Sequence, residues 1–514
     1  MKKFLITVLI VILVFGSVGA LCYFFAPDEP TNQPSQDTNS DTNVDTDTDI
    51  DVPAITDFAV ETVEDLTLAL ASSNTGARII VSETLELTEP INVGNKEVVF
   101  FFTEGYDKPI TVLLNEGKVS ILSGYFKGID IGGKGTVILE NVMSHATVED
   151  DSGLALLDGA DITLKTSGTV SLVGAKGGDG IEVPYGTKLL ITGENLVAVG
   201  NNGLEYAGLT GYDTTDDTTY LNKRGSGIGN AVENIGSITI KDMNSLTVKG
   251  YGNKAFGIGG GDKSVITIEN TLIEYARGGF PQKNFIMGNT YGKTEAEGGC
   301  AIGVGCGNDG DFDTGTVNLK NVTIKKAEGG SKSAAIGALY WTGVDISIVD
   351  CNFENIVGGN SSAGIGGSRV HKNNSQDQTV HIYIENSKIN VTGGEFGAGI
   401  GTGYDTYCQK PFGNNTIEIV GEKTSINATG GKNAAGIGSG HHTAGLSGFI
   451  GFECSITAKA GELYVYEDNY TLPQDIGYGV CNPNNELADI DLVFDIQGII
   501  VTMPVAQERA AETA

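Results

Sequence analysis

The sequence contains little positive charge and few residues of the kinds that build metal and disulfide frameworks. It has 32 Lys and Arg residues against 64 Asp and Glu, for a formal net charge of −32. Such a chain would repel nucleic-acid phosphates, so no nucleic-acid ligand is expected. The seven cysteines form no CxxC pair and no Cys/His spacing, which argues against a disulfide-stapled domain and a zinc site. With 74 Gly, 12 Pro, one Trp and 40% hydrophobic residues, the chain can form a core and many tight turns.

An isoleucine followed by glycine returns through the second half of the chain. Successive isoleucines of this Ile–Gly motif are 29 to 44 residues apart. A unit that returns at an irregular but bounded interval is typical of a solenoid, in which each repeat forms one coil and the length differences are loops. The isoleucines are Ile228, Ile258, Ile302, Ile336, Ile365, Ile400, Ile437 and Ile476.

Each Ile–Gly motif is followed by an alternating run and then by recurring polar and small residues. Alternation such as Ile266-Thr267-Ile268 predicts a strand that places its branched side chains on one buried face. Aligned repeats give a column of Asn or Asp, which can adopt left-handed backbone and hydrogen-bond along a stack. A column of small side chains, including Cys351, follows it, and a glycine pair closes each coil as a turn. The polar column is Asn270, Asn321, Asp350 and Asn386, and the pairs are Gly278-Gly279, Gly329-Gly330, Gly358-Gly359, Gly393-Gly394 and Gly430-Gly431.

These repeats, with the AAGIGSG segment at residues 434–440 as their clearest example, resemble the glycine-rich parallel β-helices common in bacterial surface proteins. The resemblance implies an all-β, single-stranded right-handed parallel β-helix (a solenoid) of pectin lyase-like fold over about residues 58–480. Spaced apolar residues between Val60 and Ala71, with acidic residues early, predict a short amphipathic helix. A helical cap over the first coil is what the resemblance implies there. Strands are expected directly after it, at residues 78–81, 85–87, 91–93 and 98–102.

The chain divides by composition into five segments. Residues 1–26 contain two lysines and then an uncharged apolar run of membrane-spanning length, so we expect a membrane anchor or a signal peptide. Residues 27–52 are polar and acidic and predict a disordered linker. Residues 53–200 are expected to form the N-terminal cap and first coils, residues 201–480 the glycine-rich repeats, and residues 481–514 a C-terminal cap or tail. Either N-terminal alternative predicts an extracellular location, membrane-anchored at the cell surface or secreted after cleavage.

Aromatic and polar residues gather in the variable segments on both sides of the Ile–Gly motifs. If Ile437 points inward, its flanking glycines leave the outer surface nearly bare backbone, and the neighbouring loops become the expected binding surface. Aromatic rings beside polar groups suit the apolar faces and hydroxyls of sugars. The alternative is that these rings fold back to cover loops or coil ends. The predicted ligand-binding residues are Tyr340, Trp341, Tyr404, Tyr407, Phe412, His441 and His442.

Three carboxylates on alternate positions, Asp309, Asp311 and Asp313, have a spacing that can wrap a calcium ion. The segment lacks the later glycine and glutamate of an EF-hand loop, so a solvated acidic loop is the alternative. We expect no cofactor other than this Ca²⁺.

Catalytic patterns of the related polysaccharide-degrading enzymes are incomplete in this chain. Its adjacent aspartate pairs are Asp150-Asp151 and Asp216-Asp217, and no R-x-K segment occurs. The arginines, Arg78, Arg224, Arg277, Arg369 and Arg509, are expected mostly in separate loops. No catalytic residue is therefore assigned. The expected function is an extracellular, envelope-tethered, adhesin-like β-helix that binds a polysaccharide or a cell-surface glycan or receptor. The alternatives are a polysaccharide lyase or glycoside hydrolase, and a structural spacer.

Overall fold

The computed structural model describes residues 57–72, 77–201, 224–230, 235–252, 254–261, 263–279, 298–305, 314–339, 342–368, 379–404, 415–432, 434–441, 449–451, 455–459, 476–477 and 493–495. These residues belong to one compact unit, Ile55–Ala514. The predicted anchor or signal peptide and the acidic linker lie outside the described residues, as does most of the predicted C-terminal cap. No helix in the described ranges is long and apolar enough to cross a membrane.

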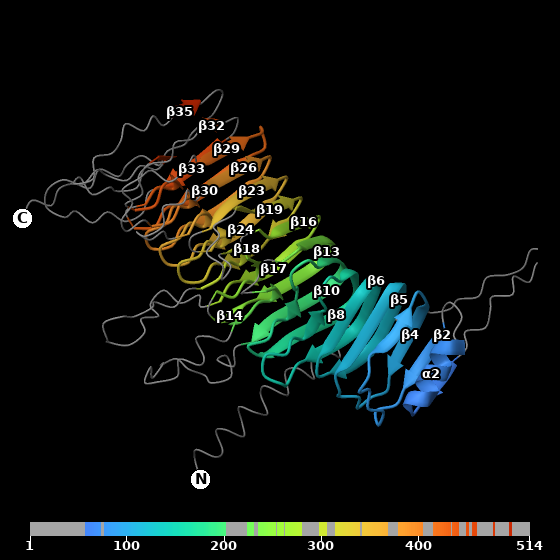
Figure 1. Cartoon of the computed structure of the whole chain (residues 1–514). Helices are drawn as coiled ribbons and strands as arrows, with labels where there is room; N and C mark the ends of the chain where they lie inside the picture. Colours follow the sequence, from blue (N-terminus) through green and yellow to red (C-terminus); the bar gives the residue numbers. More distant parts are fainter. Residues whose placement is uncertain are drawn as a thin grey trace, which may run out of the picture. The chain divides into compact units, whose positions relative to one another are not determined.

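Parallel pairing between successive coils builds the described repeats (Figure 1). Each coil contributes three kinds of strand. The Ile–Gly series consists of β9 (Ile181–Glu182), β12 (Ile228–Gly229), β15 (Ile258–Gly260), β18 (Ile302–Val304), β22 (Ile336–Ala338), β25 (Ile365–Gly366), β28 (Ile400–Gly401), β31 (Ile437–Gly438) and β34 (Ile476–Gly477). The middle series consists of β16 (Val265–Glu269), β19 (Thr314–Lys320), β23 (Gly343–Val349), β26 (Val380–Glu385) and β29 (Thr416–Val420). The last series consists of β17 (Leu272–Arg277), β20 (Thr323–Ile324), β21 (Ala327–Glu328), β24 (Asn352–Val357), β27 (Lys388–Thr392), β30 (Ser425–Thr429) and β33 (Ser455–Lys459).

Longer strands form the earlier coils and continue into the three series. β13 (Ser237–Lys249), for example, pairs with β16 through its first half and with β17 through its second. The preceding strands are β1 (Asp57–Val60), β2 (Ala77–Val81), β3 (Ile91–Gly94), β4 (Glu97–Phe102), β5 (Ile110–Phe126), β6 (Ile129–His145), β7 (Leu154–Leu156), β8 (Asp161–Lys176) and β10 (Lys188–Asn201). Two short pairs stand apart from this network: β11 (Arg224–Gly225) with β14 (Tyr251–Gly252), and β32 (Phe449–Gly451) with β35 (Val493–Asp495).

The inward side chains of all three series form one continuous apolar core. In the middle series Ile346, Ile382 and Ile417 are buried, while the residues directly before and after each of them in its strand face outward. This alternation is the pattern that period-two strands produce. The prediction of an all-β parallel β-helix with an N-terminal helical cap is confirmed. Its right-handed sense stays a prediction.

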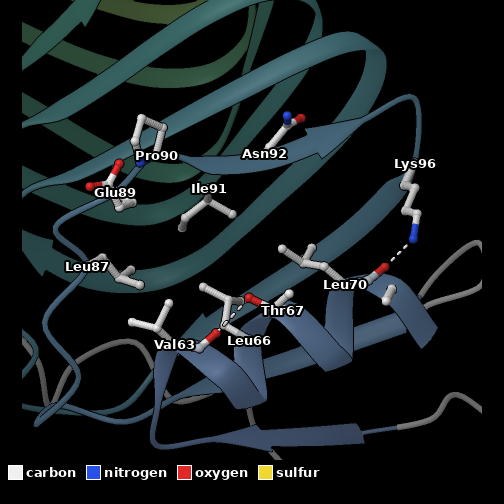
Figure 2. A pocket seen from close by; sticks show the side chains of 11 residues that line it. Val63, Leu66, Thr67, Leu70, Leu87, Glu89, Pro90, Ile91, Asn92 and Lys96 are labelled. Carbon is white, nitrogen blue, oxygen red and sulfur yellow. Dashed lines mark hydrogen bonds between the residues drawn. The ribbon is translucent and has the colours of Figure 1, made fainter.

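The cap is a single helix, α2 (Val63–Ser72), that begins with a reciprocal pair of hydrogen bonds. Asp65 N donates to Thr62 Oγ1 (3.1 Å), and Thr62 N donates to Asp65 Oδ2 (3.1 Å). This capping box satisfies backbone donors that the first helical turn leaves open. Leu66 and Ala69 are buried. Figure 2 shows the groove of about 400 Å³ between α2 and β3, where Lys96 Nζ donates to the Leu70 carbonyl.

The strand predicted at residues 85–87 is wrong, because a turn at Glu83-Thr84 leads into irregular chain there. Leu85 N donates to Ser82 O (3.1 Å). The Lys108 ammonium donates to the carbonyls of Thr84 (3.1 Å) and Leu85 (3.4 Å), so a side chain satisfies acceptors that a neighbouring strand would otherwise use. Leu85 is nevertheless buried. A leucine that packs into the core beside a turn gives the same short apolar pattern as a strand, so the sequence pattern does not distinguish the two.

The Ile–Gly motif recurs because successive coils approach each other closely at its glycine. Gly337, Gly366, Gly401 and Gly438 have φ between +126° and +137°, which side chains disfavour. A Cβ at Gly337, Gly366 or Gly401 would overlap the carbonyl oxygen of the equivalent glycine in the next coil. The prediction that the outer surface of this series is nearly bare backbone is wrong, since these glycines are buried. Part of the cover is an apolar cluster of Phe256, Cys300 and Leu339, whose atoms lie against Gly259, Gly303 and Gly305.

The predicted polar column is a ladder of left-handed corners. Asn270, Asn321, Asp350 and Asn386 have φ between +47° and +55°. Asn321 Nδ2 donates to Asn270 Oδ1 (2.9 Å), and Asn270 Nδ2 donates to Asp242 Oδ1 (2.8 Å) in the preceding coil. The column of small residues that follows is buried, as expected: Thr271, Val322, Cys351 and Ser387. Burial raises the pKa of the Cys351 thiol to about 11, so this cysteine packs as a small apolar group.

Candidate functional site

A shallow groove of about 290 Å³ crosses the outer face of the middle series. It lies over β19, β23, β26 and β29, which follow one another along the stack (Figure 1). Ile382 fills the core from β26, while the side chains on either side of it open into the groove. The outward side chains that line the groove are Asn318, Asp345, Ser347, His381, Tyr383, Thr416 and Glu418.

Strand register arranges these side chains in two rows that run from coil to coil. One row is Thr316, Asp345, His381 and Thr416, and the other is Asn318, Ser347, Tyr383 and Glu418. Neighbouring strands lie about 4.8 Å apart, so the imidazole of β26 lies beside Asp345 on β23 and the phenol lies beside Glu418 on β29. Asp345 and Glu418 are exposed, while His381 and Tyr383 are half-buried.

Hydrogen bonds hold the two ring side chains of β26 in place. A hydrogen bond of 2.7 Å joins His381 Nδ1 and Thr416 Oγ1. Tyr383 OH donates to Glu385 Oε2 (2.9 Å). Partial burial and the negative charges of Glu385 and Glu418 raise the pKa of Tyr383 to about 12. The phenol therefore stays neutral at physiological pH and presents a ring face beside groups that donate and accept hydrogen bonds.

The sequence alone did not identify this groove, although its residues occupy alternating positions of predicted strands. Within their own strands, Asn318, Ser347, Tyr383 and Glu418 are only the outward residues between buried aliphatic ones. Whether they form one surface depends on which residues lie opposite each other in coils whose matching positions are 29 to 36 residues apart. The signal that could have found them is one aromatic residue in an outward column otherwise made of small polar side chains and a carboxylate.

Two of the predicted ligand-binding residues, Tyr404 and His441, are brought into contact. Their rings stack with 5.4 Å between centroids and 3° between planes. Phe396, which the sequence did not single out, lies 5.2 Å from Tyr404 and 5.5 Å from His441. His441 is buried, and its backbone N–H donates to the Phe396 carbonyl oxygen (2.9 Å). This packing favours the alternative in which aromatic rings cover a coil corner, and ligand contact by the pair stays a prediction.

The other predicted contacts lie outside the described residues: Tyr340, Trp341, Tyr407, Phe412 and His442 for the ligand, and Asp309, Asp311 and Asp313 for calcium. Among the described residues, no three His, Cys, Asp or Glu side chains are placed to hold a metal ion.

Acidic residues gather in the first coils next to the Asp150-Asp151 pair. Ser152 Oγ donates to Glu182 Oε2 (2.9 Å) and accepts from Asp179 N (3.1 Å). Ser226 N donates to Asp179 Oδ1 (2.5 Å). Burial, together with the charge of Glu182, raises the pKa of Asp179 well above its ordinary value of 3.8. The folded chain therefore binds a proton at Asp179 more tightly than the unfolded chain does.

This raised pKa predicts a pH-dependent stability. A carboxyl group whose pKa is higher in the folded state stabilises the fold below its ordinary pKa, and this contribution is lost as pH rises through the folded pKa. Asp179→Asn mimics the neutral form, so its melting temperature should exceed that of the parent by at least about 3 °C at pH 7 and should match it near pH 3.5. Thermal melts from pH 3.5 to 8 measure this. The exposed Asp158→Asn is the control, and an equal gain in both variants would contradict a role for burial.

The arginines that the structure describes lie in strands, as expected for Arg78, whereas the predicted loop placement is wrong for Arg224 and Arg277. Arg78 lies in β2, Arg224 in β11 and Arg277 in β17. β11 pairs with β14, and the Arg277 guanidinium lies 4.2 Å from the ring centre of Tyr251 in β14. Cross-coil pairing thus places Arg224 and Arg277 beside the same short strand, although 53 residues separate them.

No protein-family model, curated protein or solved structure matches the chain.

Proposed function

We propose that the chain is an extracellular, adhesin-like β-helix of the pectin lyase-like kind found in bacterial surface proteins, and that it binds carbohydrate in the groove of the middle series. The observation that carries the proposal is the Tyr383 ring, framed by hydrogen-bonding groups on three adjacent strands. Sugar rings have apolar faces that pack on aromatic rings, and their hydroxyls bind side chains such as Asp345, His381 and Glu418. The groove is open along the stack of coils, which suits a polymer more than an enclosed small molecule.

Depletion of the full-length chain onto a panel of insoluble polysaccharides tests this proposal. Tyr383→Ala should weaken binding to the polymer that the parent chain prefers by about tenfold, because an aromatic contact at the centre of a site commonly contributes more than 1 kcal/mol. Tyr185→Ala is the matched control, since Tyr185 is 71% exposed on an earlier coil and lies outside the groove. Binding to none of the polymers, or equal losses in the two variants, would count against the proposal.

A polysaccharide lyase or glycoside hydrolase is the second candidate, favoured by one specific observation. Asp345 and Glu418, both exposed, stand on the strands that flank β26 with its His381 and Tyr383. Two carboxylates across a sugar-binding groove are what acid/base cleavage of a glycosidic bond requires. Release of new chain ends in the same incubations, abolished by Asp345→Asn or Glu418→Gln, would decide for the enzyme.

A further inference from the structure

A cluster of cations and tyrosines lies on the outer side of the last series, away from the residues that line the groove. Register places Lys249 of β13, Arg277 of β17 and Glu328 of β21 in one column. Tyr275 lies next to this column, with Lys326 Nζ 5.2 Å and Lys249 Nζ 5.8 Å from its ring centre. The Arg277 guanidinium stacks on Tyr251 at 4.2 Å. We call Lys249, Tyr251, Tyr275, Arg277, Lys326 and Glu328 the basic patch.

Positive charge exceeds negative charge in the basic patch. Its single carboxylate, Glu328, accepts from Lys326 Nζ (2.7 Å) through Oε1 and from Tyr275 OH (2.5 Å) through Oε2. Each carboxylate oxygen thus already has a partner in the patch. Burial alone would raise the pKa of Glu328, but these two hydrogen bonds and the charges of Lys326 and Arg277 lower it. Glu328 therefore stays ionised and offsets one of three cations in a chain whose net charge is −32.

The arginine of the patch has unused hydrogen-bonding capacity. Arg277 Nε and Nη2 are buried and have no hydrogen-bond acceptor among the residues that the structure describes. A buried donor without a partner costs free energy, and a charged one costs more. The Nε–Nη2 edge is also the edge that binds carboxylate or sulfate oxygens in a bidentate manner. Lys326, which pairs with Glu328, has a side chain that is 45% exposed and is therefore accessible to a ligand from solvent.

We propose that the basic patch binds the carboxylate or sulfate group of an acidic sugar. The overall charge of −32 repels densely charged polymers at long range, so the favoured ligand carries sparse anionic groups and gains further contact through apolar surface. The half-buried ring of Tyr275 supplies that surface beside the cations. Nucleic acid fits less well, since its charge density is high. This inference does not depend on the groove around Tyr383.

The full-length chain is titrated with three hexasaccharides, followed by ligand-observed NMR. One contains uronic-acid residues, one carries sulfate esters without carboxylates, and one is the carboxyl-reduced, neutral form of the first. At least one acidic hexasaccharide should bind at least about tenfold more tightly than the neutral form. Comparison of the two acidic hexasaccharides distinguishes carboxylate from sulfate. Tighter binding of a single-stranded oligonucleotide, equal binding of the neutral sugar, or no binding would overturn the proposal.

Two neighbouring lysines give a matched pair of variants. Lys325 and Lys326 have similar exposure, 48% and 45%, but Lys325 pairs with Glu274 (2.7 Å) and Lys326 belongs to the basic patch. Arg277→Gln should weaken binding of the acidic sugar about tenfold and Lys326→Gln about threefold, while Lys325→Gln should leave it within about twofold of the parent. Equal effects of the two lysine variants would show a response to net charge alone and contradict the proposal. If Arg277→Gln fails to fold by circular dichroism, the lysine pair decides.

Discussion

Gly401→Ala is expected to lower the free energy of unfolding by more than about 3 kcal/mol, or to prevent the surrounding coils from forming. Gly401 has φ +134°, and a Cβ there would overlap the carbonyl oxygen of Gly438 in the next coil. That oxygen also accepts a hydrogen bond from Thr402 N (3.1 Å). Relief of the overlap would require β28 and β31 to separate, which breaks their parallel pairing. Thermal and denaturant unfolding, followed by far-UV circular dichroism, measures the loss.

Gly128→Ala separates backbone strain from steric overlap. Gly128 has nearly the same backbone angle, φ +139°, but the nearest atom to its added Cβ would be Ser152 O at 3.7 Å. Both variants therefore include the cost of an unfavourable φ, and only Gly401→Ala includes the overlap. A solenoid can unfold in parts, so limited proteolysis should also locate new cleavage near β28. Similar losses in the two variants would contradict close approach of the coils as the reason for the Ile–Gly motif.

The sequence predicts the parts of the fold that repeat in every coil. Asn270, Asn321 and Asp350 could be assigned to one corner because a left-handed residue with a hydrogen-bonding side chain is needed at the same place in successive coils. The glycine pairs are predictable for the same reason. Gly330, Gly359, Gly394 and Gly431 each would place a Cβ on the carbonyl oxygen of the corresponding glycine one coil earlier. Backbone geometry restricts the residue type at such positions, so the restriction is visible in one sequence.

Features that depend on contacts between different side chains of distant coils could not be predicted in this way. The Phe396 ring contacts Tyr404 and His441 at a corner of the coil that the repeat pattern does not specify. The groove needs the register between β23, β26 and β29, and the basic patch needs Arg277 opposite residues from coils before and after it. Burial of the Ile–Gly glycines was missed because it depends on contact between different positions of the repeat: Phe256 and Cys300 stand two residues before their isoleucines, and Leu339 stands three residues after Ile336. These contacts are set by packing, which local sequence preference does not encode.

Phe126→Ala is expected to lower the free energy of unfolding by about 3 to 5 kcal/mol, because it removes a large ring from a closed core. Phe126 is fully buried at the end of β5. Its ring lies 4.9 Å from Phe102 in an edge-to-face arrangement and 5.8 Å from Tyr106. The three side chains come from β4, β5 and the turn between them, so one ring connects two successive coils. Denaturant unfolding gives the free-energy difference.

The adjacent Tyr125→Ala is the control for loss of an aromatic side chain at the same point of the chain. Tyr125 is 38% exposed and contacts His145 edge-to-face at 5.5 Å between ring centres, so its loss should cost no more than about 1.5 kcal/mol. In the first coils the positions in register with the Ile–Gly motif are Ile129-Asp130, Leu154-Ala155 and Ile181-Glu182, without its glycine. Several of the largest fully buried side chains, Phe100, Phe102, Tyr106 and Phe126, lie in these coils. A loss in Phe126→Ala no greater than in Tyr125→Ala would show that these rings do not hold the first coils together. A large loss would mean that aromatic packing stabilises the start of the solenoid, where close glycine contacts stabilise the later coils.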